Sequence, residues 1–228
     1  MRYDTLLFDV DDTLLDFKDA ENQALQALFS EMQLAYTPEI EQTYQRINQS
    51  RWKEYELGNM SSKEVVNGRF GLVFEKFGKQ VDSVEMEKKY RAYLNKGHKR
   101  LGNSLEIIRD LSKKVDLYIV TNGVAKTQYQ RLTDSELLPY FKDIFISEVA
   151  GFQKPRLEFF NYAFSKIPTF QKEKTAIIGD SLSSDIQGGI NAGIDTIWLH
   201  SKGTSSAKSL IPNYHITALE ELYDILGE

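Results

Sequence analysis

Three acidic residues directly after a short apolar segment constrain this chain more than any other feature. Asp9, Asp11 and Asp12 follow the apolar run at residues 5–8. A run this short, without polar–apolar alternation, is typical of a strand buried on both faces of a parallel α/β sheet, which binds ligands beyond the carboxyl ends of its strands. Like charges ~4 Å apart repel by roughly 4 kcal/mol at an effective dielectric of 20, so we expect a cation or a proton to share the cluster. Taken alone, the cluster equally fits a solvated turn in which Asp12 or Thr13 caps a helix.

Composition narrows the classes of protein that the chain can form. Its 228 residues suffice for one large domain, or for one domain with a smaller insert. A net charge of −5 argues against a surface for duplex nucleic acid, which is normally basic. The absence of cysteine excludes disulfides, thiolate catalysis and Cys-ligated zinc, and suits the cytoplasm. No apolar run is long enough to span a bilayer, and the first strand begins too early to leave room for a signal peptide, so we expect a cytoplasmic protein.

Helical periodicity dominates the region between about residues 19 and 94. Apolar residues recur there at three- and four-residue spacing, which predicts four or five amphipathic helices and no strand. The polar, glycine-bearing segment at 95–102 predicts a hinge or linker. We therefore expect a helical domain at 16–97, inserted into a core domain formed by 1–15 and 98–228.

Strand and helix patterns alternate along the chain beyond the linker. Strands are expected at 115–121, 144–147, 175–180 and 196–199, and helices at 104–113, 124–133, 155–167, 183–191 and 217–226. Such alternation implies a parallel sheet with right-handed crossovers. The expected fold class is α/β: a doubly wound, Rossmann-like parallel sheet with an inserted α-helical bundle.

Three of the expected strands end in polar residues. The strand at 5–8 is followed by Asp9 and Asp11, and the strand at 115–121 ends in Thr121, with Asn122 and Gly123 next. The strand at 175–180 ends in Asp180, with Asp185 a few residues further on. Parallel strands end at one edge of the sheet, and Lys154, in a loop before a helix, could reach that edge. The edge would combine carboxylates with a hydroxyl, a lysine and backbone N–H groups that neighbouring glycines leave accessible.

This set of side chains suits phosphate chemistry. All-oxygen ligands favour Mg²⁺, and a hydroxyl, backbone N–H groups and a lysine can cradle a phosphate. Unaided hydrolysis of phosphate monoesters is so slow that enzymatic enhancements approach ~10²¹-fold. A covalent aspartyl-phosphate divides that barrier into two steps. A second carboxyl two residues further on lies on the same face of an extended strand, where it could protonate the leaving oxygen and later activate water.

The motifs together resemble those of the haloacid dehalogenase (HAD) superfamily, on its phosphatase side. Residues 9–13 match the family's first motif DxDxT, Thr121 the second, Lys154 before Pro155 the third, and residues 179–185 the fourth motif GDSxxxD. All four occur in order, each at the end of its expected element. The resemblance covers the whole chain, because the helical insert is similar to the family's C1 cap.

The resemblance implies a role for each motif residue. Asp9 would be the nucleophile and a Mg²⁺ ligand, and Asp11 would be the general acid/base, with its backbone carbonyl as a second ligand. The phosphate would be bound by Thr121 and Lys154, with Asn122 as an added hydrogen-bonding group. Asp180 would be the third protein ligand of Mg²⁺, and Asp185 would be a further acidic ligand or a support for the ligands. The family's dehalogenases lack an acid at the position of Asp11. The implied reaction is therefore phosphoryl transfer, with Mg²⁺ as the cofactor.

A longer stretch implies a branch within the family. Residues 178–196, with 121–123 and the Asp11–Asp12 pair, resemble the bacterial pyrimidine 5′-nucleotidases, which remove phosphate from dUMP, dTMP, UMP and nonstandard nucleotides. The implied partner is a small-molecule phosphate monoester, with no duplex nucleic acid and no membrane. We expect a monomer or a weak homodimer.

Two alternatives remain open at this point. A sugar-phosphate phosphatase or phosphomutase would share the same core. A non-enzymatic phosphoacceptor or ligand sensor is an alternative of another class, because signal-receiver domains also place Asp, Thr and Lys around Mg²⁺. Receivers are about half this length and lack an inserted helical module, so the insert and Asp11 favour the enzyme.

Some residues outside the motifs are expected to have structural roles. The core of the helical bundle should contain Phe70, Phe74 and Phe77, and the nearby Trp52 and Tyr55 should pack or else stack on a base. Close helix–sheet packing should be allowed by Gly188 and Gly189. A polar loop is expected at 201–209.

Overall fold

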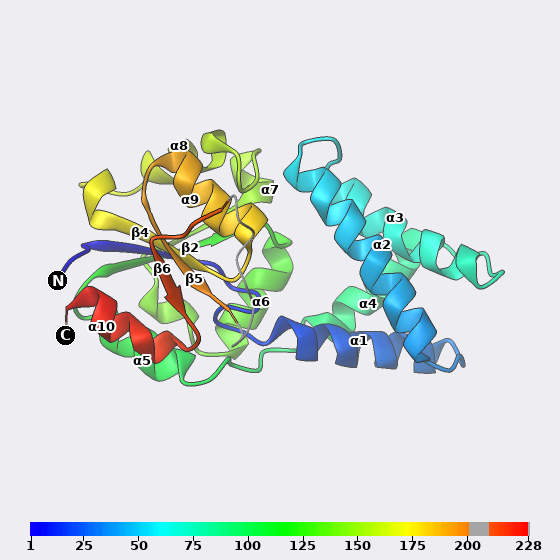
Figure 1. Cartoon of the computed structure of the whole chain (residues 1–228). Helices are drawn as coiled ribbons and strands as arrows, with labels where there is room; N and C mark the ends of the chain where they lie inside the picture. Colours follow the sequence, from blue (N-terminus) through cyan, green and yellow to red (C-terminus); the bar gives the residue numbers. More distant parts are fainter. Residues whose placement is uncertain (201–209, 228) are drawn as a thin grey trace. The chain divides into compact units, whose positions relative to one another are not determined.

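The computed structural model describes residues 1–200 and 210–227 and divides into two compact units (Figure 1). The α/β unit comprises Met1–Asp16 and His98–Glu228, and the helical unit comprises Phe17–Gly97. The loop expected at 201–209 lies outside the described residues. Among the described helices, none combines the length and the apolar character that a membrane crossing requires.

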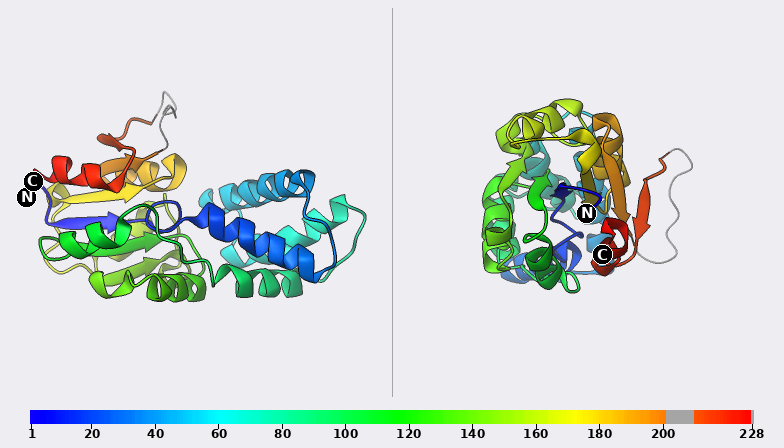
Figure 2. Two further views of the ribbon diagram at one scale, coloured as in Figure 1. Left: turned by 90° about the horizontal axis from the view of Figure 1, so that it is seen from below. Right: turned by 90° about the vertical axis from the view of Figure 1, so that its left-hand side faces the viewer.

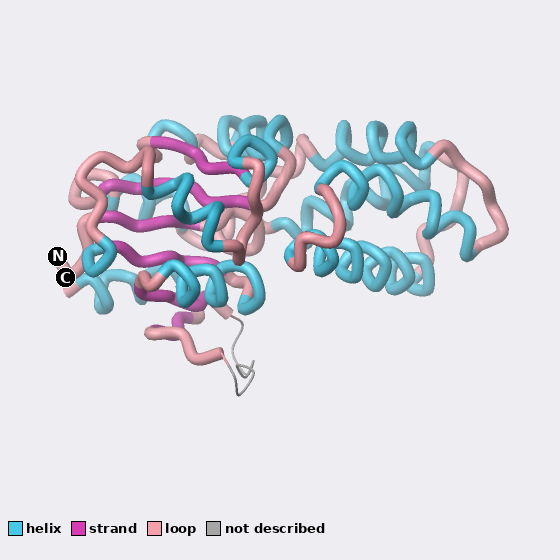
Figure 3. Tube along the Cα trace, turned by 90° about the horizontal axis from the view of Figure 1, so that it is seen from above, coloured by secondary structure: helices cyan, strands magenta, loops and turns pink. Residues whose placement is uncertain are grey.

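Parallel strands form the framework of the α/β unit. The strands are β1 (Thr5–Phe8), β2 (Asp116–Thr121), β3 (Asp143–Ile146), β4 (Thr175–Gly179), β5 (Asp195–Leu199) and β6 (Tyr214–Ile216). Within the described residues they form a six-stranded sheet in the order β3-β2-β1-β4-β5-β6, every neighbouring pair being parallel (Figure 3). The strand order reverses between β1 and β4, the switch point at which such sheets bind ligands. The predicted doubly wound, Rossmann-like α/β fold is confirmed.

Helices cover both faces of this sheet (Figure 2). Helices α5 (Ser104–Leu111), α6 (Ala125–Asp134) and α10 (Leu222–Leu226) contribute to the apolar core on one face, and α8 (Leu157–Phe164) and α9 (Gln187–Ala192) to the core on the other. Side chains of a strand alternate between faces, so Leu6 and Phe8 of β1 join the first core and Leu7 the second. β1 is therefore buried on both faces, as its short apolar run predicted.

The helix expected at 155–167 begins later than the sequence indicated. Helix α8 starts at Leu157, because the backbone at Arg156 is extended and Pro155 lies in the turn before it. The N–H of Arg156 donates to the carbonyl of Gln153 at 2.9 Å, which closes this turn ahead of the helix. The prediction that Pro155 opens the helix was therefore wrong.

The C-terminal half holds further differences of boundary. The helix expected at 217–226 is a 3₁₀ turn at Leu219–Glu221 followed by α10, because the Glu221 carboxylate accepts the N–H groups of Thr217 and Ala218 and keeps them outside the helix. The helix expected at 183–191 begins with a π-helical turn at Leu182–Ile186 before α9. The sequence did not predict α7 (Ser147–Ala150) and β6, which are too short to show periodicity.

Four helices make up the helical unit. They are α1 (Phe17–Glu31), α2 (Pro38–Glu56), α3 (Ser62–Lys76) and α4 (Ser83–Leu94). Thr37, Ser61 and Asp82 begin three of them as N-caps that accept backbone N–H groups, and Glu64 completes a capping box with Ser61. These caps fix where the helices start and agree with the predicted count of four or five.

The aromatic residues of the insert form its core, as predicted. Phe70 and Phe74 are fully buried, and Phe77 packs against the same cluster. Tyr55 is buried and meets Trp52 edge to face, with ring centroids 5.6 Å apart. This contact agrees with the first of the two roles expected for Trp52 and Tyr55, which is packing.

A buried ion pair crosses the helical unit. The guanidinium of Arg69 in α3 donates to the carboxylate of Glu87 in α4 at 2.8 and 2.9 Å, and to Asn48 Oδ1 in α2 at 2.9 Å. Arg69 also lies over the ring of Tyr90, 4.7 Å from its centroid. Bidentate pairing satisfies charges that would otherwise be costly to bury.

Two glycines let α9 approach its neighbours closely. A Cβ on Gly188 would come within 2.6 Å of the Phe160 ring, and one on Gly189 within 2.5 Å of Thr196 Cγ2 on β5. The predicted close helix–sheet packing is confirmed for Gly189, which faces β4 and β5, whereas Gly188 allows close packing of α9 against helix α8 instead.

Candidate active site

The end of β1 places Asp9 at the switch point of the sheet. The register aligns Phe8 with Ile119 of β2 and Ile178 of β4, and the Asp9 N–H donates to the Ile178 carbonyl at 2.9 Å. The first acid therefore lies between the carboxyl ends of β2 and β4, where the strands carry Thr121 and Asp180.

Lys154 joins two of the predicted acids. Its Nζ donates to Asp9 Oδ1 at 2.8 Å, to Asp185 Oδ1 at 2.6 Å and to the Val120 carbonyl at 2.7 Å. An ammonium has three donors, and all are engaged. Lys154 is only 1% exposed, so it is an internal ion-pair partner and not a surface lysine.

Burial and neighbouring charges control the electrostatics of this trio. Burial, opposed by Lys154 and reinforced by Asp185 and Asp11, raises the pKa of Asp9 to about 7. Burial also disfavours the Lys154 ammonium, but the carboxylates of Asp185 and Asp9 outweigh it and hold the pKa of Lys154 above its ordinary value. The lysine therefore stays charged and stabilises the Asp9 carboxylate.

Three carboxylates lie close enough to share a cation. Oxygens of Asp9, Asp180 and Asp185 all lie within 4.8 Å of one another. Their three formal negative charges face the single positive charge of Lys154, which leaves an excess of two. Hard oxygen donors with this excess suit Mg²⁺ in both ligand type and charge.

A glycine at the end of β4 makes room for the Asp185 carboxylate. A Cβ on Gly179, at the end of β4, would collide with the Asp185 carboxylate. The second Asp185 oxygen accepts the backbone N–H of Ser181 at 3.1 Å, and the first accepts Lys154. The glycine of the fourth motif therefore allows its last aspartate to fold back onto the strand end.

Asn122 fixes the loop that carries Lys154. Its Nδ2 donates to the Lys154 carbonyl and its Oδ1 accepts the Lys154 N–H, both at 2.9 Å. The side-chain amide thus pairs with the backbone of Lys154 much as a neighbouring strand would. Binding of phosphate by Asn122 itself stays a prediction.

Asp11 and Thr121 contact side chains that the motifs did not indicate. Gln128 Nε2 of α6 donates to Asp11 Oδ2 at 2.7 Å and to Thr121 Oγ1 at 3.1 Å, and Arg131 Nη1 donates to Asp11 Oδ1. The carboxylate of Asp11 therefore points to α6, while its predicted contribution to a metal is through its backbone carbonyl. The missed signal was local: Gln128 and Arg131 share a helix face with the core residue Leu132, where apolar residues are expected.

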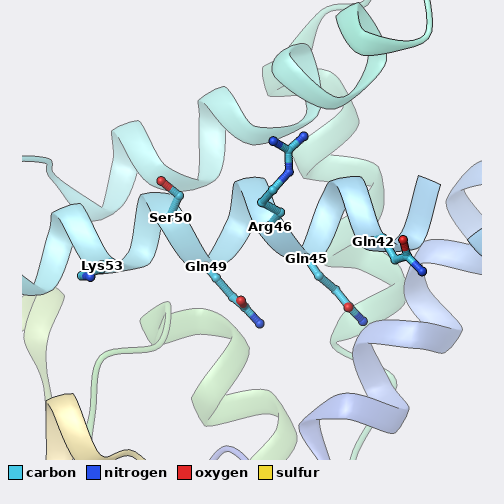
Figure 4. Close-up of a pocket in the computed structure, with 6 residues that line it drawn as sticks. All are labelled: Gln42, Gln45, Arg46, Gln49, Ser50 and Lys53. Carbon is cyan, nitrogen blue, oxygen red and sulfur yellow. The ribbon is translucent and has the colours of Figure 1, made fainter. Parts of the chain in front are cut away.

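A separate pocket of about 370 Å³ lies on the helical unit (Figure 4). Six polar residues of α2 line it: Gln42, Gln45, Arg46, Gln49, Ser50 and Lys53. None belongs to the predicted site, whose residues all lie in the α/β unit.

The fold and the site define a class of protein. It is a Rossmann-like α/β protein with a helical insert after its first strand, and with clustered carboxylates and a buried lysine at the switch point. Within this class, the chain belongs to the haloacid dehalogenase-like hydrolases, whose family model matches residues 6–199. The chain is therefore an enzyme of the hydrolase class, as predicted.

Relatives of similar length support the predicted branch. YfnB of Bacillus subtilis, named a HAD-hydrolase, is 50% identical over 99% of this chain and 96% of its own. The pyrimidine 5′-nucleotidase PynA of Streptococcus pneumoniae is 40% identical, over 100% of this chain and 97% of its own. The pyrimidine 5′-nucleotidase YjjG of Escherichia coli is 30% identical over 99% of both chains. The resemblance to the pyrimidine 5′-nucleotidase branch is confirmed.

A crystal structure shares the fold throughout. The structure of YfnB bound to magnesium superimposes with a TM-score of 0.94 and 49% identity, and covers 100% of both chains. The fold of this chain is therefore shared with a relative whose crystal structure contains magnesium.

Proposed function

We propose that this protein is a Mg²⁺-dependent phosphatase that forms a phosphoenzyme on Asp9 and acts on pyrimidine nucleoside 5′-monophosphates such as dUMP, dTMP and UMP. The substrate class rests on PynA and YjjG, which match nearly the whole chain. The observation that carries the mechanism is Lys154, buried between Asp9 and Asp185 at the switch point.

In the first step, a carboxylate oxygen of Asp9 attacks phosphorus, and the bond from phosphorus to the ester oxygen breaks. Asp11 donates its proton to that oxygen, and the nucleoside leaves as an alcohol. The Asp11 side chain is 29% exposed, against 11% for Asp9, which suits a group that exchanges protons with substrate and water.

In the second step, water attacks the phosphorus of the phosphoenzyme. Asp11, now a carboxylate, takes a proton from this water, the bond between phosphorus and Asp9 breaks, and inorganic phosphate leaves. The Asp9 carboxylate is restored and regains its hydrogen bond from Lys154. During phosphoryl transfer, Lys154 and the Thr121 hydroxyl stabilise the phosphoryl oxygens.

The residues present fit the expected cofactor. Asp9, Asp180 and Asp185, with the backbone carbonyl of Asp11, would hold Mg²⁺ among oxygen donors carrying excess negative charge. Bound there, the ion would neutralise charge on the transferring phosphoryl group. Asp185, held by Lys154 and Ser181, would also keep the neighbouring acids in place.

The test measures phosphate release with and without Mg²⁺. The panel contains dUMP, dTMP, UMP, purine monophosphates, hexose phosphates and phosphoglycolate. We expect Mg²⁺-dependent release mainly from the pyrimidine monophosphates, and none from the Asp9→Asn variant, which keeps the fold but lacks the nucleophile. Normal turnover by that variant would overturn the mechanism.

Two other outcomes would favour the alternatives. Release mainly from hexose phosphates would keep the mechanism and replace the substrate class with sugar phosphates. No release, together with a phosphorylated protein that persists for hours, would instead indicate a phosphoacceptor.

A further inference from the structure

Helix α6 carries three buried polar residues, and two of them, Gln128 and Arg131, contact Asp11. Gln128 is 1% exposed and Arg131 is fully buried. They are three positions apart, so they lie on the same face of the helix. Burying an amide and a guanidinium is costly unless their partners repay it, so their contacts are informative.

The two side chains donate to different oxygens of the Asp11 carboxylate. Gln128 Nε2 donates to Asp11 Oδ2 at 2.7 Å, and Arg131 Nη1 donates to Asp11 Oδ1. A carboxylate offers about four lone-pair positions, and these contacts fill one on each oxygen. The plane of the carboxylate is fixed, while each oxygen keeps a position that can accept or donate the transferred proton.

Gln128 also limits the direction in which the Thr121 hydroxyl can donate a hydrogen bond. Thr121 Oγ1 accepts Gln128 Nε2 at 3.1 Å and the Gly123 N–H at 3.0 Å. A hydroxyl oxygen has two lone pairs, and both are now occupied. The O–H is therefore limited to the remaining tetrahedral direction, from which it can donate to an anion at the strand end.

Only one end of the Gln128 amide is satisfied by hydrogen bonds within the described residues. Its Oε1 is buried and has no hydrogen-bond partner among the described residues. An unsatisfied buried acceptor costs roughly 1–3 kcal/mol. In addition, a Cβ on Gly123 would overlap this amide, so the chain turn at the end of β2 is shaped around Gln128.

We propose that Gln128 and Arg131 are positioning residues, which fix the carboxyl group of Asp11 for proton transfer. Gln128 also directs the Thr121 hydroxyl toward the phosphoryl group. This inference rests on the proposed function, since it assigns Asp11 the proton transfer and Thr121 the phosphate.

Two substrates whose leaving groups differ in basicity distinguish a loss of proton transfer by Asp11 from a general loss of activity. Deoxyuridine leaves dUMP as an alkoxide that needs a proton, whereas p-nitrophenolate leaves p-nitrophenyl phosphate as a stable anion. Single-turnover release of each is measured for the parent, Gln128→Met, Arg131→Met and Arg131→Lys. General acid–base catalysis contributes about 10²–10⁴-fold, so we expect both Met variants to slow dUMP cleavage at least about tenfold.

Release of p-nitrophenolate should fall less than about threefold in Arg131→Met. Gln128→Met should also raise KM for both esters, because it releases the Thr121 hydroxyl. Arg131→Lys keeps the charge and should recover part of the dUMP rate. Gln130→Met is the matched control, because Gln130 is exposed on the same helix and its amide donates to Asp134 at 2.7 Å, and it should behave as the parent.

Gly123→Ala provides a second route if a buried variant does not fold. Its methyl group would lie 2.1 Å from Gln128 Nε2, so we expect the amide to shift and the substrate-dependent loss to be reproduced. Equal losses on both esters in folded variants would overturn the positioning role. A parent protein that cleaves neither ester would contradict the proposed function itself, and the positioning role would fall with it.

Discussion

The chemical type of each site residue was visible in the sequence, but its partners were not. Lys154 illustrates this, because the sequence places it in a loop that could reach the strand ends but does not show which side chains it contacts. The structure buries it between Asp9 and Asp185, which lie 145 and 31 positions away along the chain. Pairing across such separations depends on how β1, β2 and β4 are brought together, and local patterns do not encode it.

Because Lys154 is buried, replacing it measures how much its ion pairs contribute to stability. Lys154→Met would leave two neighbouring buried carboxylates without their cation, and removing one partner of a buried pair typically costs about 3–5 kcal/mol. We expect a loss of that order in the free energy of unfolding, measured by urea denaturation in EDTA. Mg²⁺ should restore part of it.

Lys99→Met is the control for this measurement. Lys99 also pairs with an aspartate, Asp16, at 2.9 Å, but its side chain is 61% exposed. Exposed pairs contribute little, so this variant should unfold almost like the parent. Equal losses in the two variants would contradict the assigned role of Lys154.

Secondary-structure elements with strong periodicity were predicted well, and short ones were not. The strand at Asp116–Thr121 and the helix at Ala125–Asp134 each begin and end within one residue of expectation. The start of α8 was missed, because a turn closed by Gln153 and Arg156 overrides the usual preference for proline in the first helical turn. The three-residue β6 is defined by pairing with β5 rather than by its own pattern.

Helix α9 offers a prediction about packing between elements. In an isolated helix, Gly189→Ala would be favourable by about 1 kcal/mol. Here the new methyl group would meet Thr196 and Ile177, whose nearest atoms lie at 2.5 and 2.6 Å, and overpacking of this kind costs about 1–3 kcal/mol. We expect a net loss of stability in thermal unfolding.

Ile190→Ala tests the same helix without the clash. Ile190 is the next residue and is 42% exposed, so its truncation should change the melting temperature little. A Gly189→Ala protein that is as stable as the parent would show that α9 can move away from the sheet at no cost.

At the scale of the whole molecule, the chain is a sheet unit interrupted by a helical unit with its own core. The sheet unit consists of two segments, Met1–Asp16 and His98–Glu228. They are joined in the sheet because β1 of the first segment pairs with β2 and β4 of the second. A cation shared by Asp9, Asp180 and Asp185 would bind only when those segments are assembled, because the unfolded chain keeps the acids apart.

Mg²⁺ should therefore stabilise the folded protein by mass action. At a concentration 100 times its Kd, the gain is about 2.7 kcal/mol, which is visible as a higher melting temperature. Asp180→Asn should remove most of this shift, whereas the same substitution at the exposed Asp143 should leave it intact. An undiminished shift in Asp180→Asn would place the ion elsewhere.

The sequence by itself determined the fold class, the insert and the identity of the residues at the strand ends, because these follow from local periodicity and from motifs of adjacent residues. Tertiary structure alone decided which of these residues touch. It buried Lys154 between two acids, turned the Asn122 amide onto a neighbouring loop and placed Gln128 and Arg131 around Asp11. The physical reason is that burial, pairing and hydrogen-bond geometry depend on distances between segments, and these are set only when the whole sheet is packed.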